Sequence, residues 1–181
     1  MEVRVVNRVF WLFGRSGAGK TTLATRLRQG LRDRGLPVFF IDGDDARGGL
    51  SLDLGYHPGA RTEHHRRVAE VAKLACGQGI LPVVATMAPE HAQREMVSRI
   101  LGTRLVWVFV EAPLEECLKR DPKGLYRRAR AGELQNLIEY PFDPPKEEER
   151  RFTIQTGGAS VEASYQRLLE GVLAELADPN L

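Results

Sequence analysis

Short apolar runs alternate along the chain with longer segments whose apolar residues recur at helical spacing. The short runs predict β-strands, and the longer segments predict amphipathic helices. We expect strands at residues 8–13, 38–41, 80–85, 104–110 and 152–155. We expect helices from about residue 20 to 34, 62 to 78, 90 to 101 and 160 to 176, and a further helix that Pro113 opens before a basic segment ending at Ala131.

This order of elements predicts the fold class. Strands that alternate with helices imply βαβ units, and such units build a parallel sheet covered by helices on both faces. We therefore expect an α/β fold with a doubly wound, five-stranded parallel sheet. Residues 136–145 carry three prolines and are expected to form a loop. Since no repeat or linker divides the chain, we expect residues 1–181 to form a single domain.

Composition and charge exclude several classes of function. The chain has 181 residues, of which 43% are hydrophobic, and its formal net charge is only +2. It is therefore no polycation, we expect no nucleic-acid partner, and anions must be bound by locally placed Arg and Lys. No apolar run approaches the roughly 20 residues that span a bilayer, and the first ten residues lack the apolar core of a signal peptide. We expect a cytoplasmic protein without a membrane partner.

The strongest chemical signal is a phosphate-binding loop. Residues 14–21 read GRSGAGKT, which matches G-x-x-x-x-G-K-[ST] directly after a predicted strand and at the start of a predicted helix. Glycines let backbone N–H groups point at one phosphate, Lys20 reaches the outer phosphates, and the Thr21 hydroxyl is a ligand for Mg²⁺. The alternative is a glycine-rich turn that binds nothing. The candidate ATP-binding residues are Gly14, Ser16, Gly17, Ala18, Gly19, Lys20, Thr21 and Thr22.

Other features separate a kinase from the remaining users of such a loop. The chain lacks the N/T-K-x-D motif of common GTPases, and the predicted strand at 80–85 leads into the uncharged Thr86 instead of an acid. The acids follow the strand at 38–41, where Asp42 and Asp44 are candidate catalytic residues at the same sheet edge as the loop. A carboxylate there can hold the water shell of Mg²⁺ or accept a proton from an attacking hydroxyl. The alternative is a capped turn.

A basic segment follows the acids. Arg47 lies three residues after Asp44, and residues 61–67 read RTEHHRR at the start of the second long helix. Five residues fall on one line of that helix, Arg61, His64, Val68, Ala72 and Ala75, and we expect its lower part in the core. The upper end would then point into the cleft and meet an anionic substrate, although such a run is also typical of a solvated basic face.

At this point the residues resemble the adenylylsulfate kinase family over about residues 10 to 160. The resemblance includes the phosphate loop, DGDDAR at 42–47, LGY at 54–56, Arg61 and RRVAEVAKL at 66–74. Its most specific part is RDPKGLY at 120–126 with ARAG at 129–132. The family has a P-loop kinase fold, and the resemblance implies transfer of the γ-phosphoryl group of ATP to the 3′-hydroxyl of adenosine 5′-phosphosulfate, with Mg²⁺. It also implies a homodimer.

The resemblance further implies roles for individual residues. The segment at about 120–150 corresponds to a lid over both nucleotides, with Arg120 on the ATP side. The acceptor site would comprise Asp42, Asp44, Arg47, Tyr56, Arg61, His64, Lys123 and Leu125. An aromatic ring at Tyr56, where the family usually has Phe, can stack on the adenine.

The chain departs from the family on the acceptor side. His64 and Asp45 stand where the family has Asn, Ala88 replaces a serine, His91 replaces an arginine, and NLIEY at 136–140 is unlike the family's segment. His64, unlike Asn, is expected to change its protonation state between about pH 5 and 8. The runner-up function is therefore a paralogous kinase of another 5′-modified nucleotide, such as cytidine diphosphoramidate. A non-catalytic nucleotide-binding module is a third reading, which the intact Lys20, Thr21 and Asp44 oppose.

Overall fold

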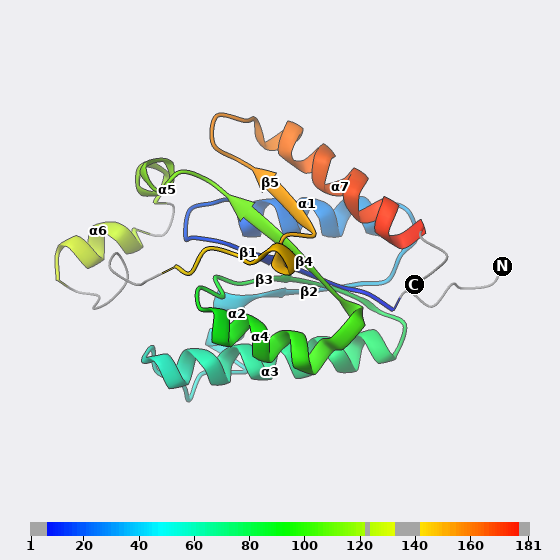
Figure 1. Ribbon diagram of the computed structural model, residues 1–181, viewed down its shortest axis with the longest axis horizontal. Coiled ribbons are helices and arrows are strands. Elements are labelled where there is room, and N and C mark those ends of the chain that lie inside the picture. The colour runs from blue at the N-terminus through cyan, green and yellow to red at the C-terminus, as the bar shows by residue number, and fades with distance from the viewer. Residues whose placement is uncertain (1–6, 122–123, 133–141, 178–181) are drawn as a thin grey trace.

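A five-stranded parallel sheet runs through the middle of the molecule, with the strand order β2-β3-β1-β4-β5 (Figure 1). The computed structural model describes residues 7–121, 124–132 and 142–177. The strands are β1 (Val9–Phe13), β2 (Val38–Asp42), β3 (Leu81–Ala85), β4 (Leu105–Glu111) and β5 (Phe152–Gln155). The predicted doubly wound α/β fold is therefore confirmed.

Helices cover both faces of this sheet. The helices are α1 (Lys20–Arg32), α2 (Gly43–Gly48), α3 (Pro58–Gly77), α4 (His91–Leu101), α5 (Leu114–Arg120), α6 (Leu125–Arg130) and α7 (Val161–Ala177), and short 3₁₀ turns lie at Gly102–Arg104 and Glu147–Glu149. In Figure 1, α1 and α7 lie on one face, α3 and α4 lie on the other, and α5 and α6 extend beyond one end of the sheet. Among the described helices, none is both long and apolar enough to cross a membrane.

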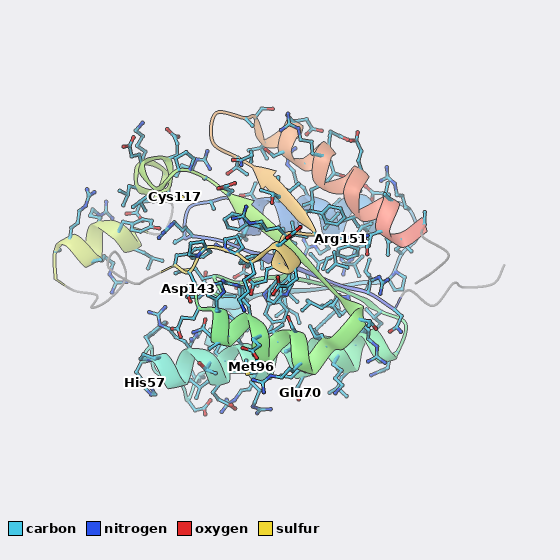
Figure 2. All side chains as sticks on the ribbon, in the orientation of Figure 1. His57, Glu70, Met96, Cys117, Asp143 and Arg151 are labelled. Carbon is cyan, nitrogen blue, oxygen red and sulfur yellow. The ribbon has the colours of Figure 1, made fainter. Side chains whose placement is uncertain are left out.

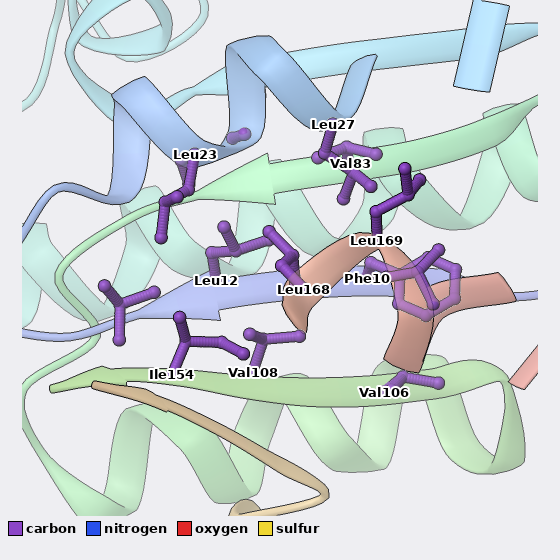
Figure 3. Close-up of a cluster of buried hydrophobic side chains, with 14 of the residues drawn as sticks. Phe10, Leu12, Leu23, Leu27, Val83, Val106, Val108, Ile154, Leu168 and Leu169 are labelled. Atoms are coloured by element: carbon purple, nitrogen blue, oxygen red, sulfur yellow. The ribbon is translucent and has the colours of Figure 1, made fainter. Parts of the chain in front are cut away.

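The two faces of the sheet bury separate apolar clusters. Side chains alternate along β1, so Phe10 and Leu12 pack toward α1 and α7, as Figure 3 shows, whereas Trp11 and Phe13 pack with residues of α3 and α4. Every residue of β1 is buried. A central parallel strand therefore reads as a continuous apolar run. Full burial of one such side chain contributes about 1.5–3 kcal/mol.

The start of α3 differs from the expected residue 62. The helix begins at Pro58, because a proline suits the first helical position and His57 caps it. The Nδ1 atom of His57 accepts a hydrogen bond from the Ala60 amide at 3.2 Å. On the lower part of the predicted line of α3, Val68 and Ala72 are buried, as expected, whereas Ala75 is half-buried and the neighbouring Cys76 is buried.

Two further segments are more helical than the sequence indicated. Residues 43–48 form the short helix α2 where a capped turn was the alternative. The segment opened by Pro113 forms two short helices, α5 and α6, and Gly124 before α6 has a φ of +62°. Residues 142–145 of the predicted proline-rich loop carry no helix or strand, whereas 136–141 lie outside the described residues.

Candidate active site

A cavity of about 1080 Å³ lies at the carboxyl ends of the strands. Parallel strands end at one edge of a sheet, so the segments after β1, β2 and β3 meet there. Figure 2 shows His57 and Asp143, from distant parts of the chain, toward the end of the molecule where α5 carries Cys117. Most of the sequence-predicted site residues line this cavity: Ser16, Gly17, Gly19, Lys20, Thr21, Thr22, Asp42, Asp44, Arg47, Tyr56, Arg61, His64, Arg120 and Leu125.

Two of the predicted residues of the phosphate loop do not face the cavity. Gly14 and Ala18 are buried and are not among the residues that line the cavity. Gly14 has a φ of +150°, and a Cβ there would lie 2.3 Å from the carbonyl oxygen of Val110. Only glycine fits at this position, so Gly14 allows the loop to pack against β4. Lys123 lies outside the described residues.

The loop presents cations to the cavity. Helix α1 begins at Lys20, directly after the loop, so its amino end and partial positive charge face the site. The ammonium group of Lys20 donates a hydrogen bond to the carbonyl oxygen of Arg15 at 2.8 Å. Gly17 has a φ of +78°, and a Cβ there would lie 2.7 Å from the carbonyl oxygen of Cys117. The loop is therefore packed tightly between β1 and α5.

The acidic segment holds the first turn of α1. Thr21 Oγ1 donates a hydrogen bond to Asp42 Oδ2 at 2.7 Å, and the Asp44 amide donates one to Asp42 Oδ1 at 2.8 Å. Both carboxylate oxygens of the buried Asp42 are thus engaged, and Asp42 is the N-cap of α2. The side chain of Asp44, two residues later, lines the cavity.

A second support of the loop comes from β5 and α5. Arg120 Nη2 donates to the carbonyl oxygen of Thr156 at 2.7 Å, and Thr156 Oγ1 donates to the carbonyl oxygen of Ala18 at 2.7 Å. The Tyr126 hydroxyl donates to the carbonyl oxygen of Ser16 at 3.0 Å, and burial raises the pKa of Tyr126 to about 12. Sequence reasoning missed Thr156, although its place directly after β5 puts it at the same sheet edge.

Two arginines donate hydrogen bonds to the loop that carries Tyr56. Arg47 Nη1 donates to the carbonyl oxygen of Gly55 at 2.8 Å, and its guanidinium carbon lies 5.0 Å from the centroid of the Tyr56 ring. Arg61 Nε donates to the carbonyl oxygen of Tyr56 at 2.7 Å. Burial lowers the pKa of both guanidinium groups. Tyr56 is 70% exposed, so this aromatic residue is accessible beside two cations.

His64 does not behave as the sequence suggested. Its Nδ1 atom lies 3.0 Å from Ser51 Oγ, and burial lowers its pKa to about 3. His64 is therefore neutral between about pH 5 and 8, contrary to the expectation that it titrates there. Burial favours the neutral imidazole because a charged imidazolium loses its hydration inside the protein.

Other residues line the cavity without having been predicted. They come from α1, from the start of α2 and of α3, from the end of β3 and the segment after it, from α6, from the segment after β5, and from the start of α7: Leu23, Gly43, His57, His65, Ala85, Thr86, Met87, Pro89, Arg128, Thr156, Ala159, Val161 and Ser164. Thr86 accepts a hydrogen bond from Trp11 Nε1 at 2.9 Å. The sheet order could have indicated the residues after β3, because β3 lies between β1 and β2.

Ala88 and His91, two of the departures from the family, both contact Arg94, which forms a buried ion pair with Glu149. Arg94, which is fully buried, lies 2.9 Å from Glu149 and donates from Nη1 to the carbonyl oxygen of Ala88 at 2.8 Å. The Nδ1 atom of His91 lies 2.9 Å from Arg94 Nη2. His91 is not among the described residues that line the cavity. It supports the segment before β5 instead.

Comparison with known proteins identifies close relatives. Residues 6–153 match the family model described as adenylylsulphate kinase. The chain is 43% identical over 171 residues to an adenylyl-sulfate kinase of Bacteroides thetaiotaomicron, covering 93% of this chain and 84% of the relative. It is 45% identical over 164 residues to an adenylyl-sulfate kinase of Aeromonas salmonicida, covering 89% and 83%.

The fold comparison agrees. The Mycobacterium tuberculosis APS kinase CysC in complex with AMPPNP and APS has a TM-score of 0.86 and 32% identity, and the match covers 92% of this chain and 97% of that one. A gluconokinase from Sinorhizobium meliloti shares the fold, with a TM-score of 0.66, 20% identity, and coverage of 95% and 94%.

Proposed function

The chain belongs to the adenylylsulfate kinase family, and we propose that it transfers the γ-phosphoryl group of ATP to the 3′-hydroxyl of adenosine 5′-phosphosulfate (APS). The product is 3′-phosphoadenosine 5′-phosphosulfate, which belongs to sulfate assimilation. The O–P bond to the leaving ADP breaks as the ribose oxygen bonds to phosphorus, and the hydroxyl proton leaves to a base.

The observation that carries this function is the two-ended cavity. The phosphate loop with Lys20 follows β1, whereas Arg47, Arg61 and the exposed Tyr56 follow β2, two strands away in the sheet. A volume of about 1080 Å³ exceeds what one drug-sized ligand needs and supports simultaneous binding of two nucleotides. Transfer then depends mainly on holding the two reacting groups in line and on neutralising charge.

At the donor end, Lys20 and the amino end of α1 neutralise the outer phosphates of ATP. We propose that Mg²⁺ binds here, because the Thr21 hydroxyl and the Asp42 carboxylate are hard oxygen donors that already lie 2.7 Å apart. Mg²⁺ keeps several waters in such sites and needs few protein ligands. When bound, Mg²⁺ would offset the negative charge of the phosphates. Arg120 braces the loop from the opposite side.

At the acceptor end, Asp44 accepts the proton of the attacking 3′-hydroxyl or orients that hydroxyl. Its position at the start of α2, next to the capping Asp42, supports this role. Arg47 and Arg61 bind the phosphosulfate, since a guanidinium donates from several N–H groups and keeps its charge at working pH. Tyr56 stacks on the adenine. Lys123 and Leu125 complete the acceptor side by resemblance.

Four broader expectations stay proposals. The chain acts as a single domain, which its one organising sheet supports. It forms a homodimer, which light scattering at several concentrations would test. The segment at about 120–150 closes over the nucleotides, and the contacts of Arg120 and Tyr126 with the phosphate loop support that placement. The cytoplasmic location stays a prediction.

The test is ATP consumption against a panel of nucleotide acceptors. We expect turnover with APS and formation of the 3′-phosphorylated product, identified by mass and by phosphorus NMR. Cytidine diphosphoramidate is the rival acceptor, because His64, which stands where the family has Asn, lines the cavity. Turnover of the cytidine compound without turnover of APS would exclude the proposed substrate and leave the kinase assignment standing. ATP binding without turnover of any acceptor would favour a binding module.

A further inference from the structure

His65 is a buried residue that lines the cavity at its acceptor end. It follows His64 on α3, and the two rings meet edge to face with their centroids 5.4 Å apart. On its other side lies Trp11, with ring centroids 6.5 Å apart. His65 is 4% exposed, so the protein itself determines the position of its ring.

The hydrogen bonds of His65 define its tautomer. The Nδ1 atom lies 2.7 Å from the carbonyl oxygen of Arg61. A carbonyl oxygen only accepts hydrogen bonds, so Nδ1 carries the hydrogen and donates. Burial lowers the pKa of His65 to about 4, and the ring is therefore neutral at physiological pH. In the neutral ring, Nε2 has a lone pair and acts as an acceptor.

This acceptor atom lacks a partner in the part of the chain that the structure describes. His65 Nε2 is buried and makes no hydrogen bond to any described residue. A buried polar atom without a partner is unfavourable, and native proteins nearly always satisfy such atoms with protein, water or ligand. His65 lines the cavity, and its closed-off Nε2 atom can be reached by a ligand only when neighbouring side chains shift, so a donor group of a bound ligand is the candidate partner.

We propose that His65 is a specificity-determining residue whose Nε2 accepts a hydrogen bond from an N–H or O–H group of the acceptor nucleotide. The inference rests on the proposed function, because it concerns the acceptor of that same reaction. A lone pair attracts a donor and gives an anionic or apolar group no favourable partner. A site with such a buried acceptor rejects analogues that lack the matching donor.

The chemistry of APS limits the donor to few groups. Besides the reacting 3′-hydroxyl, the nucleotide carries a 2′-hydroxyl and a 6-amino group. The 2′-deoxy analogue removes the first donor, and the analogue with unsubstituted purine removes the second. These two compounds therefore test whether the 2′-hydroxyl or the 6-amino group is the partner of His65.

The experiment compares acceptor KM, ATP KM and kcat for the parent protein, His65→Leu and His65→Gln. Leucine keeps the volume approximately and removes the acceptor atom, whereas the glutamine Oε1 atom can replace Nε2. We expect His65→Leu to raise the acceptor KM roughly 5- to 150-fold, as for loss of one buried hydrogen bond, with ATP KM unchanged. His65→Gln should restore the KM to within a few-fold of the parent value. One of the two analogues should bind worse to the parent but no worse to His65→Leu.

The matched control is Val68→Ala. Val68 is buried on the same face of α3 and is not among the described residues that line the cavity, so its truncation loosens the packing alone. We expect lower thermal stability and an unchanged acceptor KM. An acceptor KM that is the same in His65→Leu and the parent overturns the inference, since a buried water would then satisfy Nε2. The inference is also overturned if both analogues raise the acceptor KM of His65→Leu by the same factor as they raise that of the parent. If the parent protein uses another nucleotide of the panel, the proposed substrate fails and the His65→Leu comparison is made with that nucleotide, where an unchanged KM again overturns the inference.

Discussion

Thr21 Oγ1 donates a hydrogen bond to Asp42 Oδ2 over 2.7 Å, which joins the first turn of α1 to the end of β2. Strand β3 lies between β1 and β2 in the sheet, so this bond crosses the carboxyl edge of β3. It brings a carboxylate to the hydroxyl that is expected to bind Mg²⁺. The same carboxylate caps α2 through the Asp44 amide, so the donor and acceptor sides of the site share one residue.

The first prediction separates this role of Asp42 from simple capping. In Asp42→Asn, the amide can still accept from the Asp44 amide, but its NH₂ group cannot accept from Thr21. We expect kcat/KM for MgATP to fall roughly 10- to 100-fold, the cost of a hydrogen bond to a charged group. Asp45→Asn, on the exposed side of α2, is the control and should leave the rate unchanged. Equal rates in the two variants would contradict the role.

The second prediction concerns Asp44. We expect Asp44→Asn to lower kcat by about 10²–10⁴, the usual cost of losing a general base, because an amide cannot take the hydroxyl proton. ATP affinity, measured by calorimetry, should change little. A variant with altered ATP affinity and an unchanged kcat would show that Asp44 binds the donor and does not act in the transfer step.

The third prediction is that Lys20→Ala abolishes turnover with any acceptor. The transferring phosphoryl group then loses its fixed cation at the phosphate loop. Lys73→Ala is the control, since Lys73 is exposed on α3 and the variant should retain the parent rate. A near-parental rate of Lys20→Ala at saturating ATP and Mg²⁺ would remove Lys20 from the mechanism.

Much of the fold was predictable because the strands are short, apolar and bounded by glycine or proline. The strand predicted at residues 152–155 is β5, and β1 begins one residue later than expected. The start of α3 was missed because the cap is His57, an uncommon residue at that position. Helix ends depend on such individual hydrogen bonds, which a periodic pattern does not contain.

The candidate site was predictable where a motif specifies it. Most of the phosphate loop, together with Asp44, Arg47 and Arg61, lines one cavity. The sequence could not show that Asp42 uses both oxygens on Thr21 and Asp44, because this depends on the distance between β2 and α1. Nor could it show the burial of His65, which depends on the rotation of α3 against the sheet.

The fourth prediction separates the two ends of the cavity. We expect Arg61→Ala to raise the acceptor KM by about tenfold or more, because a charged donor and its support of the Tyr56 carbonyl are both lost. The ATP KM should stay nearly constant, since the phosphate loop lies at the other end. Arg66→Ala is the control, because Arg66 is exposed and pairs with Glu63 on the surface of α3. Similar increases of KM for ATP and acceptor would contradict the division.

The last prediction follows from the burial of two neutral histidines. The pKa of His64 is about 3 in the folded protein and near 6.5 in the unfolded chain, and that of His65 is about 4. As pH falls below about 6.5, the unfolded chain takes up protons that the folded protein does not, so stability is present above that pH and is lost below it. Each histidine contributes a slope of up to about 1.4 kcal/mol per pH unit.

Urea unfolding at about pH 7, 6 and 5 measures this slope, in a range where few carboxyl groups titrate. His64→Asn removes one titrating group and keeps a polar side chain next to Ser51, so we expect the slope to fall by about one proton. His64→Asn combined with His65→Gln should remove most of the dependence. A slope in His64→Asn equal to that of the parent would mean that His64 is protonated in the folded protein. In that case the acceptor KM of the parent would also vary across the same pH range, which gives an independent check on the result.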